Sequence, residues 1–234
     1  MKPLCIDLYC GLGGWAAGFL AEGYRVIGFD TERHNYGTGT YPGDLVLQDV
    51  RTLNGSQFRN AAVIVASPPC QEYSYRAMPW KRAKALPPPS NELFDTCFRI
   101  QREATKAAGH WIPMIVENVC GAQKWVGQAG WHHGSYYLWG DVPALMPTTK
   151  GMKNWGGSWF NIAHNTTSGC GQNPDGRCVK GFQTKFRDTP WVWESSRSLA
   201  RKRASAEIAK IPFPLAQWIA KVYRQVRDTR DWML

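Results

Sequence analysis

Residues 4–15 read LCIDLYCGLGGW, an apolar run that ends in a glycine-rich turn. Residues 15–22 continue as a stretch typical of a helix. A strand, a glycine turn and a helix in succession let the backbone approach a nucleotide-like ligand closely. The glycine spacing differs from the strict dinucleotide fingerprint, so a purely structural turn remains the alternative. The stretch therefore predicts an α/β fold with a candidate nucleotide site.

Two further apolar runs each end on an acidic residue. Residues 24–29 predict a strand that ends at Asp30, and residues 45–48 predict one that ends at Asp49. In such folds an acid at the end of a strand accepts hydrogen bonds from ribose hydroxyls. A helix N-cap is the alternative role for both carboxylates.

A thiol follows a third apolar run, in residues 63–71, which read VIVASPPCQ. The two prolines fix φ and remove two backbone donors, so the chain leaves the sheet in one defined direction. Cys70 is therefore a candidate nucleophile, with a buried structural cysteine as the alternative. Residues 111–119, WIPMIVENV, predict a strand that finishes on Glu117 and Asn118. Because ligands lie at the carboxyl ends of parallel strands, we expect Cys70 and Glu117 to share one crevice.

These segments together resemble the cytosine-5 DNA methyltransferases, in the compact form found in phages and prophages. Residues 7–14 resemble the family's first S-adenosylmethionine motif, residues 68–71 its catalytic loop and residues 117–119 its base-binding triplet. Residues 93–100 resemble the helix between the loop and the triplet. Each motif is weak alone, but their order and spacing together are highly specific.

The resemblance implies an S-adenosylmethionine-dependent methyltransferase fold, which is a Rossmann-like α/β fold. Its sheet is mixed and mostly parallel, with helices on both faces and a small loop-rich recognition region. Residues 1–146 would form the catalytic and cofactor-binding lobe, and residues 147–197 the target-recognition region. Residues 198–234 would be C-terminal helices that return to the catalytic lobe, with helices expected at 198–211 and 214–222.

The resemblance also implies a DNA (cytosine-5-)-methyltransferase, which moves a methyl group from S-adenosylmethionine to carbon 5 of a flipped cytosine in double-stranded DNA. Cys70 would add to carbon 6, Glu117 would hold the base, and Asn118 would shape the site. The residues expected to bind the cofactor are Asp7, Leu8, Tyr9, Gly11, Gly13, Gly14, Asp30, Thr31, Asp49, Val50 and Pro69. Those expected to contact DNA are Gln71, Ser74, Arg76, Lys81 and Arg82.

Two departures from the family leave contacts unassigned. The usual Gln-x-Arg-x-Arg strand has no counterpart, and the apolar stretch 134–140 stands in its place. Residues 211–216 resemble the last cofactor motif, but Ala209 occupies a position where asparagine is common. A DNA-binding protein that holds the cofactor without methylating therefore remains an alternative, as does an RNA cytosine-5 methyltransferase. An amino-methyltransferase shares the fold but typically carries an aromatic residue where this chain has Cys70.

The composition favours a globular protein with a polyanionic partner. The chain has 234 residues, of which 44% are hydrophobic, and a net charge of +10. Basic side chains bind phosphates with release of counterions, which favours DNA. Basic residues gather at 76–84, in a stretch that we interpret as a mobile loop able to clamp nucleic acid. They gather again at 197–203, where a solvated helix face is the alternative.

The remaining signals predict a cytoplasmic monomer without a metal. No apolar run approaches the roughly 18 residues that span a membrane, and no signal-like segment opens the chain. Seven cysteines, none in a Cys-x-x-Cys pair, suit a reducing compartment. Cys170 and Cys178, with His164 nearby, match no standard zinc spacing. We interpret His132-His133 as a polar loop near phosphate. A restriction-modification context, with or without a cognate nuclease, fits this reading.

Overall fold

The computed structural model describes residues 2–35, 39–74, 85–133, 135–146, 206 and 209–231. The strands in these residues form one seven-stranded sheet with the order β3-β2-β1-β4-β5-β7-β6. They are β1 (Leu4–Leu8), β2 (Arg25–Asp30), β3 (Asp44–Leu47), β4 (Ala61–Ala66), β5 (Met114–Asn118), β6 (Trp131–His133) and β7 (Tyr136–Gly140).

The sheet is parallel from β1 to β5, whereas β7 runs antiparallel to β5 and β6 antiparallel to β7. The chain leaves β1 on one side to build β2 and β3, then crosses to the other side of β1 for β4 and β5. At such a switch the loops after β1 and β4 diverge and open a crevice at the carboxyl ends of the strands. The predicted Rossmann-like, mostly parallel sheet is confirmed.

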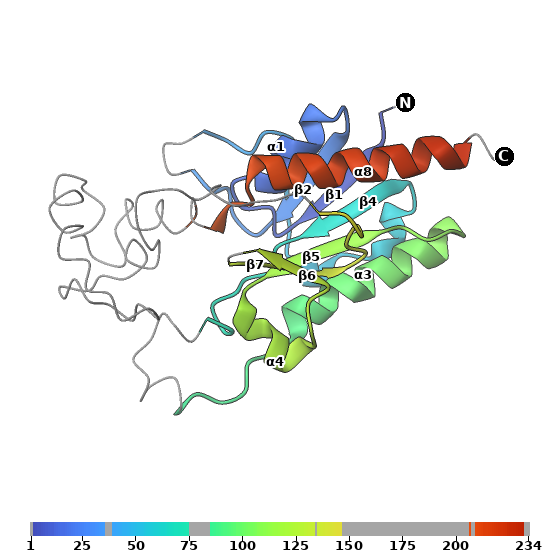
Figure 1. Ribbon diagram of the computed structural model, residues 1–234. Coiled ribbons are helices and arrows are strands. Elements are labelled where there is room, and N and C mark those ends of the chain that lie inside the picture. Colours follow the sequence, from blue (N-terminus) through green and yellow to red (C-terminus); the bar gives the residue numbers. More distant parts are fainter. Residues whose placement is uncertain are drawn as a thin grey trace, which may run out of the picture.

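Helices cover both faces of the sheet. Helices α1 (Gly14–Ala21) and α8 (Phe213–Asp231) lie on one face, and α3 (Glu92–Ala108) lies on the other (Figure 1). Short helical turns fill the connections at η1 (Val50–Thr52), η2 (Gly55–Phe58), η4 (Cys120–Ala122) and α4 (Gln123–Val126). None of the helices in the described residues combines the length and the apolarity that crossing a membrane requires.

The core follows from the two-residue period of the strands. Along β4, Ile64 packs in the cluster under α3, whereas Val63 and Val65 pack in the cluster under α1 and α8. Successive side chains of a strand point to opposite faces. Because both faces are covered, a central strand is buried along its whole length and carries a continuous apolar run.

Helix α8 brings the C-terminal part of the chain back onto α1. A Cβ atom on Gly14 would lie 2.5 Å from the backbone nitrogen of Ile211, and one on Gly18 would lie 2.4 Å from that of Gln217. Only glycine allows so close a backbone approach at these two positions. The segment 209–211 is consequently held against the first turn of α1, at the carboxyl edge of the sheet.

The reading of His132-His133 as a polar loop is wrong. Both residues belong to β6, a three-residue edge strand whose His132 pairs with Tyr137 of β7. A strand of three residues is too short to show an alternating hydrophobic pattern in the sequence. It is stabilised by its hydrogen bonds to β7. Helix α8 also continues well past residue 222, where we expected it to end, since residues 223–231 contain good helix formers.

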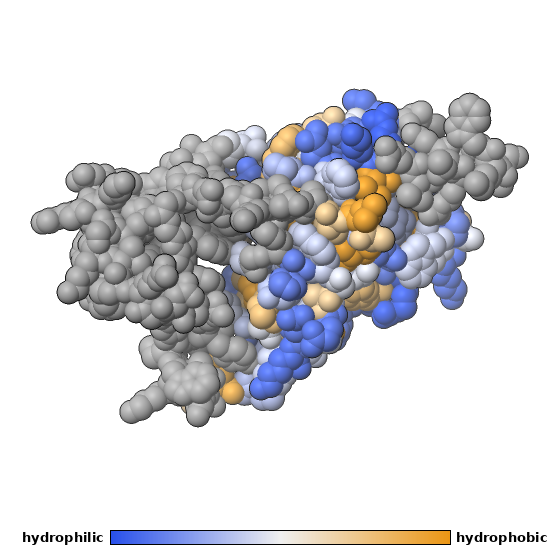
Figure 2. All heavy atoms as spheres, in the orientation of Figure 1, coloured by the Kyte–Doolittle hydropathy of each residue, from blue (hydrophilic) through white to orange (hydrophobic). Residues whose placement is uncertain are grey.

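Several predicted features lie outside the described residues. These are the recognition region at 147–197, the basic stretch at 76–84 and most of the helix expected at 198–211. On the face shown in Figure 2, hydrophobic residues gather near the middle, beside residues of intermediate and hydrophilic character. Leu145 and Trp218 are among the exposed large apolar side chains, and the Trp218 indole donates a hydrogen bond to the Leu145 carbonyl at 3.0 Å.

Candidate active site

A pocket of about 860 Å³ opens at the carboxyl ends of β1, β2 and β4. Its walls come from the turn after β1, the end of β2, the start of η1, the loop after β4, the start of α3, and residues 206 and 209–211. This volume is typical of a site for a small molecule or cofactor. Of the predicted cofactor residues, those that line it are Tyr9, Gly11, Gly14, Asp30, Thr31, Asp49, Val50 and Pro69.

The turn after β1 has a strained backbone at Tyr9. This residue adopts a φ of 56°, in the left-handed region that non-glycine residues rarely enter, at a cost of about 1–3 kcal/mol. Its hydroxyl donates to the carbonyl of Leu93 on α3 at 3.1 Å. Gly11 follows with a φ of 49°. Contacts around this turn therefore stabilise a strained conformation that exposes backbone atoms to the pocket.

Asp30 is held as a carboxylate by three donors. Its Oδ2 accepts from the amide of Gly11 at 2.9 Å, and its Oδ1 accepts from the amide of Thr31 at 2.8 Å. His34 Nε2 lies 3.4 Å from Oδ1. Burial opposes ionisation, but the hydrogen bonds from His34, Gly11 and Thr31 outweigh it and lower the pKa of Asp30. An ionised acceptor of this kind suits the hydroxyls of a ribose.

Asp49 has the helix-capping role that we considered as its alternative. Its side chain caps η1 by accepting from the amide of Arg51 at 2.9 Å, and it also forms an ion pair with the Arg51 guanidinium at 2.6 Å. These hydrogen bonds to Arg51 lower the pKa of Asp49. The cap fixes the next residue, Val50, which is buried and lines the pocket.

The thiol of Cys70 lies near the carboxylate of Glu117. Cys70 is half-buried, and burial together with the charge of Glu117 raises its pKa to about 11. The proximity follows from the strand order, since β4 and β5 are neighbours with Ala66 opposite Val116. Pro69 and Gln71 line the pocket, whereas Cys70 itself does not. In the free protein the thiol is therefore protonated at neutral pH, beside the pocket wall.

Asn118 ties the end of β5 to the loop that carries the thiol. Its side chain is only 1% exposed, and its Nδ2 donates to the carbonyl of Pro68 at 3.0 Å. Its Oδ1 accepts from the amide of Val119 at 2.8 Å. On the other side of the loop, the indole of Trp15 donates to Ser67 Oγ at 3.0 Å. Asn118 thus positions Cys70 through the backbone that precedes it.

We expect Asn118→Ala to lower the catalytic rate more than it lowers cofactor affinity. The substitution leaves the Pro68 carbonyl and the Val119 amide without their buried partner, which costs about 1–3 kcal/mol of stability per unpaired group. The thiol loop then becomes less fixed, whereas the pocket at Asp30 is untouched. Steady-state kinetics with a cofactor titration would check this. A loss of cofactor affinity equal to the loss in rate would contradict the positioning role.

The chain after Cys70 folds into a turn that is anchored at both ends. The amides of Tyr73 and Ser74 each donate to the carbonyl of Cys70 at 3.0 Å. The Tyr73 hydroxyl donates to Asn91 Oδ1 at 3.0 Å, and the carboxylate of Glu72 accepts from the amide of Ser90 at 2.6 Å. The predicted DNA contacts Gln71 and Ser74 lie in this turn. Arg76, Lys81 and Arg82 fall outside the described residues.

Three predicted cofactor residues are placed away from the pocket wall. Asp7 and Leu8 are fully buried in the core, and Gly13, with a φ of 72°, does not line the pocket either. Asp7 Oδ2 accepts from the Tyr41 hydroxyl at 3.0 Å, and burial raises the pKa of Asp7 well above its usual range. Any contribution of these three residues to cofactor binding stays a prediction.

The pocket also contains residues that the sequence did not indicate. Among them are Trp15, His34, Arg51, Ser67 and Lys210. The resemblance of residues 211–216 to a cofactor motif was the one available signal for Lys210, which directly precedes them. The others could not be recognised, because a single aromatic residue in a helix, or a single polar residue in a turn or loop, can have many roles.

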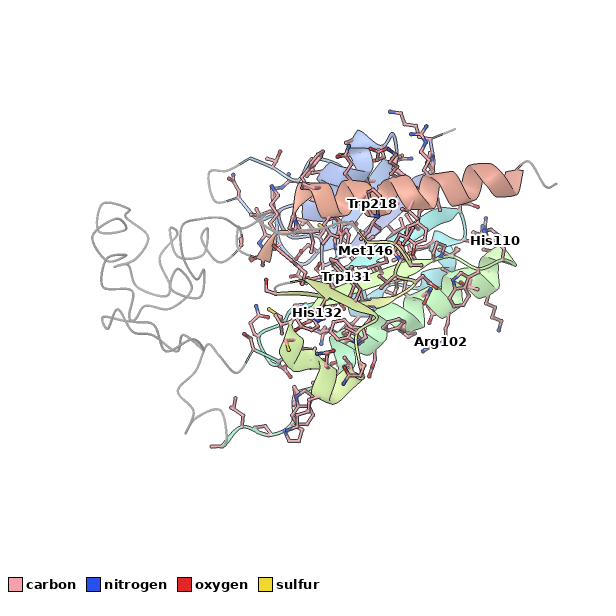
Figure 3. The ribbon with its side chains drawn as sticks, in the orientation of Figure 1. Arg102, His110, Trp131, His132, Met146 and Trp218 are labelled. Atoms are coloured by element: carbon pink, nitrogen blue, oxygen red, sulfur yellow. The ribbon has the colours of Figure 1, made fainter. Side chains whose placement is uncertain are left out.

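The β6–β7 hairpin beside β5 includes the apolar stretch that stands in place of the family's Gln-x-Arg-x-Arg strand. Asn118 pairs with Tyr137, which pairs in turn with His132. The His132 ring stacks on Tyr137 with centroids 4.7 Å apart and planes 8° apart, at the sheet edge where Figure 3 labels His132. The hairpin sequence, residues 131–140, has no arginine.

A family model for the C-5 cytosine-specific DNA methylases matches residues 4–124, which is just over half of the chain. The chain belongs to the C-5 cytosine-specific DNA methylase family. The match with this methylase family runs from β1 into α4 and includes Cys70, Glu117 and Asn118. The family match thus includes the thiol, the carboxylate and all of the pocket wall except residues 206 and 209–211.

Solved structures give weaker similarity to this chain. One is described as a DNA modification methyltransferase encoded within a prophage (E. coli), with 25% identity, a TM-score of 0.38, and coverage of 54% of this chain and 35% of that one. A Spodoptera frugiperda DNMT2 variant has 19% identity, a TM-score of 0.35 and coverage of 53% and 38%. The S. pombe Dnmt2 methyltransferase has 16% identity, a TM-score of 0.36 and coverage of 53% and 36%.

The chain therefore spans little more than a third of the length of these solved proteins. Comparison with curated proteins gives no significant match.

Proposed function

We propose that this protein is a DNA cytosine-5 methyltransferase that uses S-adenosylmethionine and acts as a monomer on double-stranded DNA. The observation that carries the proposal is the proximity of Cys70 to Glu117 at adjacent strand ends, next to a pocket with an ionised carboxylate. An amino-methyltransferase would have no use for this thiol and carboxylate pair. Membership of the methylase family supports the same chemistry.

The residues of the pocket fit S-adenosylmethionine. Asp30 can accept from both ribose hydroxyls, and the exposed backbone of the Gly11 turn allows close approach of the ligand. Val50 provides an apolar wall and Tyr9 an aromatic one for the adenine. When bound, this cofactor supplies an electrophilic methyl group on a sulfonium centre.

The residues at the strand ends act on the cytosine. Carbon 5 is a poor nucleophile, so Cys70 as a thiolate adds to carbon 6, which makes carbon 5 electron-rich. After carbon 5 is methylated, a base such as water takes its proton, the freed electron pair forms the double bond between carbons 5 and 6, and the bond between sulfur and carbon 6 breaks to release Cys70 as a thiolate. Glu117 accepts from the exocyclic amine and holds the protonated ring nitrogen N3, an interaction that is strongest as charge develops during addition.

We propose that bound substrate promotes the ionisation of Cys70. With a pKa of about 11, the free protein holds Cys70 as the neutral thiol at neutral pH. A cytosine that is bound to Glu117 neutralises part of that negative charge, and this favours the thiolate. Nucleophile activation would then be coupled to entry of the flipped base.

The net charge of +10 supports a nucleic acid as the partner. We propose that Gln71 and Ser74, with Arg76, Lys81 and Arg82, contact the DNA around the flipped base. Residues 147–197 would read the target sequence, because loop-rich segments on a rigid scaffold usually carry recognition. Phosphate contacts in the first group would position the duplex, and base contacts in the second would specify it.

Bisulfite sequencing of DNA from cells that express the protein would test the proposed function. We expect protected cytosines at a fixed sequence motif, and none when Cys70→Ala is expressed instead. Mass spectrometry of nucleosides from the same cells distinguishes the alternatives. Methylation on a base nitrogen, or binding to DNA without methylation, would contradict the proposal. 5-Methylcytidine in RNA alone would reassign the substrate.

A further inference from the structure

The pocket contains more acidic than basic side chains. Its acidic residues are Asp30, Glu32, Asp49, Glu72 and Glu92, and its basic ones are His34, Arg51 and Lys210. A ligand with its own cationic groups, such as a sulfonium and an ammonium, suits this balance. A ligand that also carries an anionic group needs one of the basic side chains.

Two of those basic side chains are already engaged by carboxylates. Arg51 lies 2.6 Å from Asp49 and 3.7 Å from Glu92. His34 lies 3.4 Å from Asp30 and 3.6 Å from Glu32. Lys210 forms no ion pair within the part of the chain that the structure describes. Among the basic side chains of the described pocket wall, Lys210 is therefore the one that a ligand can bind without displacing a carboxylate.

The backbone around Lys210 is held at a defined place. Its amide donates to the carbonyl of Ala206 at 3.0 Å, and its carbonyl accepts from the Tyr136 hydroxyl at 3.3 Å. The next residue, Ile211, lies against Gly14 so closely that a Cβ on that glycine would be 2.5 Å from the Ile211 nitrogen. Lys210 thus lies beside the first turn of α1.

The strand order sets which end of the cofactor would reach Lys210. Asp30 follows β2 and Cys70 follows β4, with β1 between them. A cofactor whose ribose binds Asp30 and whose methyl group is directed to the Cys70 side therefore extends across the turn after β1. The first turn of α1 and Lys210 both line this part of the pocket, so the amino-acid end of the cofactor would meet them there, and the amides of a helix N-terminus also favour negative charge.

We propose that Lys210 binds the α-carboxylate of the methionine moiety of S-adenosylmethionine, an inference that rests on the proposed function. A hydrogen bond between an ammonium and a carboxylate is charge-assisted on both sides and is among the strong ones in proteins. Lys210 would therefore select ligands that carry the amino acid over the bare nucleoside.

Calorimetric titration of the full-length protein with two ligands tests this inference. S-adenosylhomocysteine retains the carboxylate, and 5′-methylthioadenosine lacks the whole amino-acid group. We expect Lys210→Met to weaken S-adenosylhomocysteine about tenfold or more, with the affinity for 5′-methylthioadenosine within about twofold of wild type. Lys210→Arg should restore most of the loss. Lys221→Met on the exposed surface of α8 is the matched control and should change neither affinity.

Equal weakening of both ligands by Lys210→Met would overturn the inference, because it would indicate a structural role for the side chain. An unchanged affinity for S-adenosylhomocysteine would also overturn it. A wild-type protein that binds neither ligand would instead contradict the proposed cofactor. The failure of the proposed function is thereby distinguishable from the failure of the Lys210 assignment. Circular dichroism of each variant verifies that it is folded.

Discussion

Cys70→Ala is expected to reduce methyl transfer to background while the protein still folds and binds S-adenosylmethionine. Removing a covalent nucleophile removes the step that activates carbon 5, and such losses commonly reach about 10³-fold or more. The side chain of Cys70 belongs to neither of the two buried core clusters, so we expect little change in stability. DNA affinity should also change little, because the thiol acts in the covalent step.

Methyl transfer from radiolabelled S-adenosylmethionine would measure this effect. Cys120→Ala is the matched control, since Cys120 is an exposed free thiol that directly follows the Glu117 to Val119 triplet. DNA that contains 5-fluorocytosine should trap a covalent complex with wild type and with the control, but not with Cys70→Ala. Turnover by Cys70→Ala above about 1% of wild type would contradict the nucleophilic role.

Glu117→Gln is expected to lower the rate of methyl transfer by about 10²–10³-fold, as the loss of one preorganised charge interaction does. The same substitution should make the Cys70 thiol more acidic in the free protein. The negative charge of Glu117 opposes formation of the thiolate and contributes to a Cys70 pKa of about 11. A neutral glutamine removes that repulsion, so the pKa falls and more thiolate is present at a given pH.

Two measurements on Glu117→Gln thus move in opposite directions. Methyl transfer should slow, whereas alkylation of Cys70 by iodoacetamide, followed by site-resolved mass spectrometry across a pH series, should become faster below the wild-type pKa. Asp44→Asn is a matched control, because Asp44 forms a surface ion pair with Arg25 on the far side of the sheet. An unchanged alkylation profile would show that Glu117 does not act on the thiol. A collapse of S-adenosylmethionine affinity would place Glu117 in the cofactor site instead.

The amino-acid sequence alone was sufficient for the central strands and the main motifs. Strands β1, β4 and β5 are covered on both faces, so their residues form continuous apolar runs that a linear reading detects. Polar residues at or after strand ends stand out against such apolar runs, namely Asp30 at the end of β2, Cys70 in the loop after β4 and Glu117 near the end of β5. A strand that depends on a partner is different: β6 has three residues and no apolar pattern, and its pairing with β7 defines it.

The roles of individual side chains were decided by tertiary structure. Asp49 and Asp30 looked equivalent in sequence, yet one caps η1 and pairs with Arg51 while the other accepts from the turn after β1. Asn118 positions the thiol loop through the carbonyl of Pro68, fifty residues away in the chain. Lys210 reaches the pocket because glycines at positions 14 and 18 let α8 and the segment before it approach α1.

The acidity of the Cys70 thiol was likewise decided by tertiary structure. Its pKa depends on how deeply Cys70 is buried and on a charge that comes from a neighbouring strand. A residue pattern along the chain can therefore identify the groups that perform the chemistry. Distances between strands, which arise only when the sheet forms, determine how those groups are charged and held, because electrostatic and hydrogen-bond energies depend on separation in space and not along the sequence.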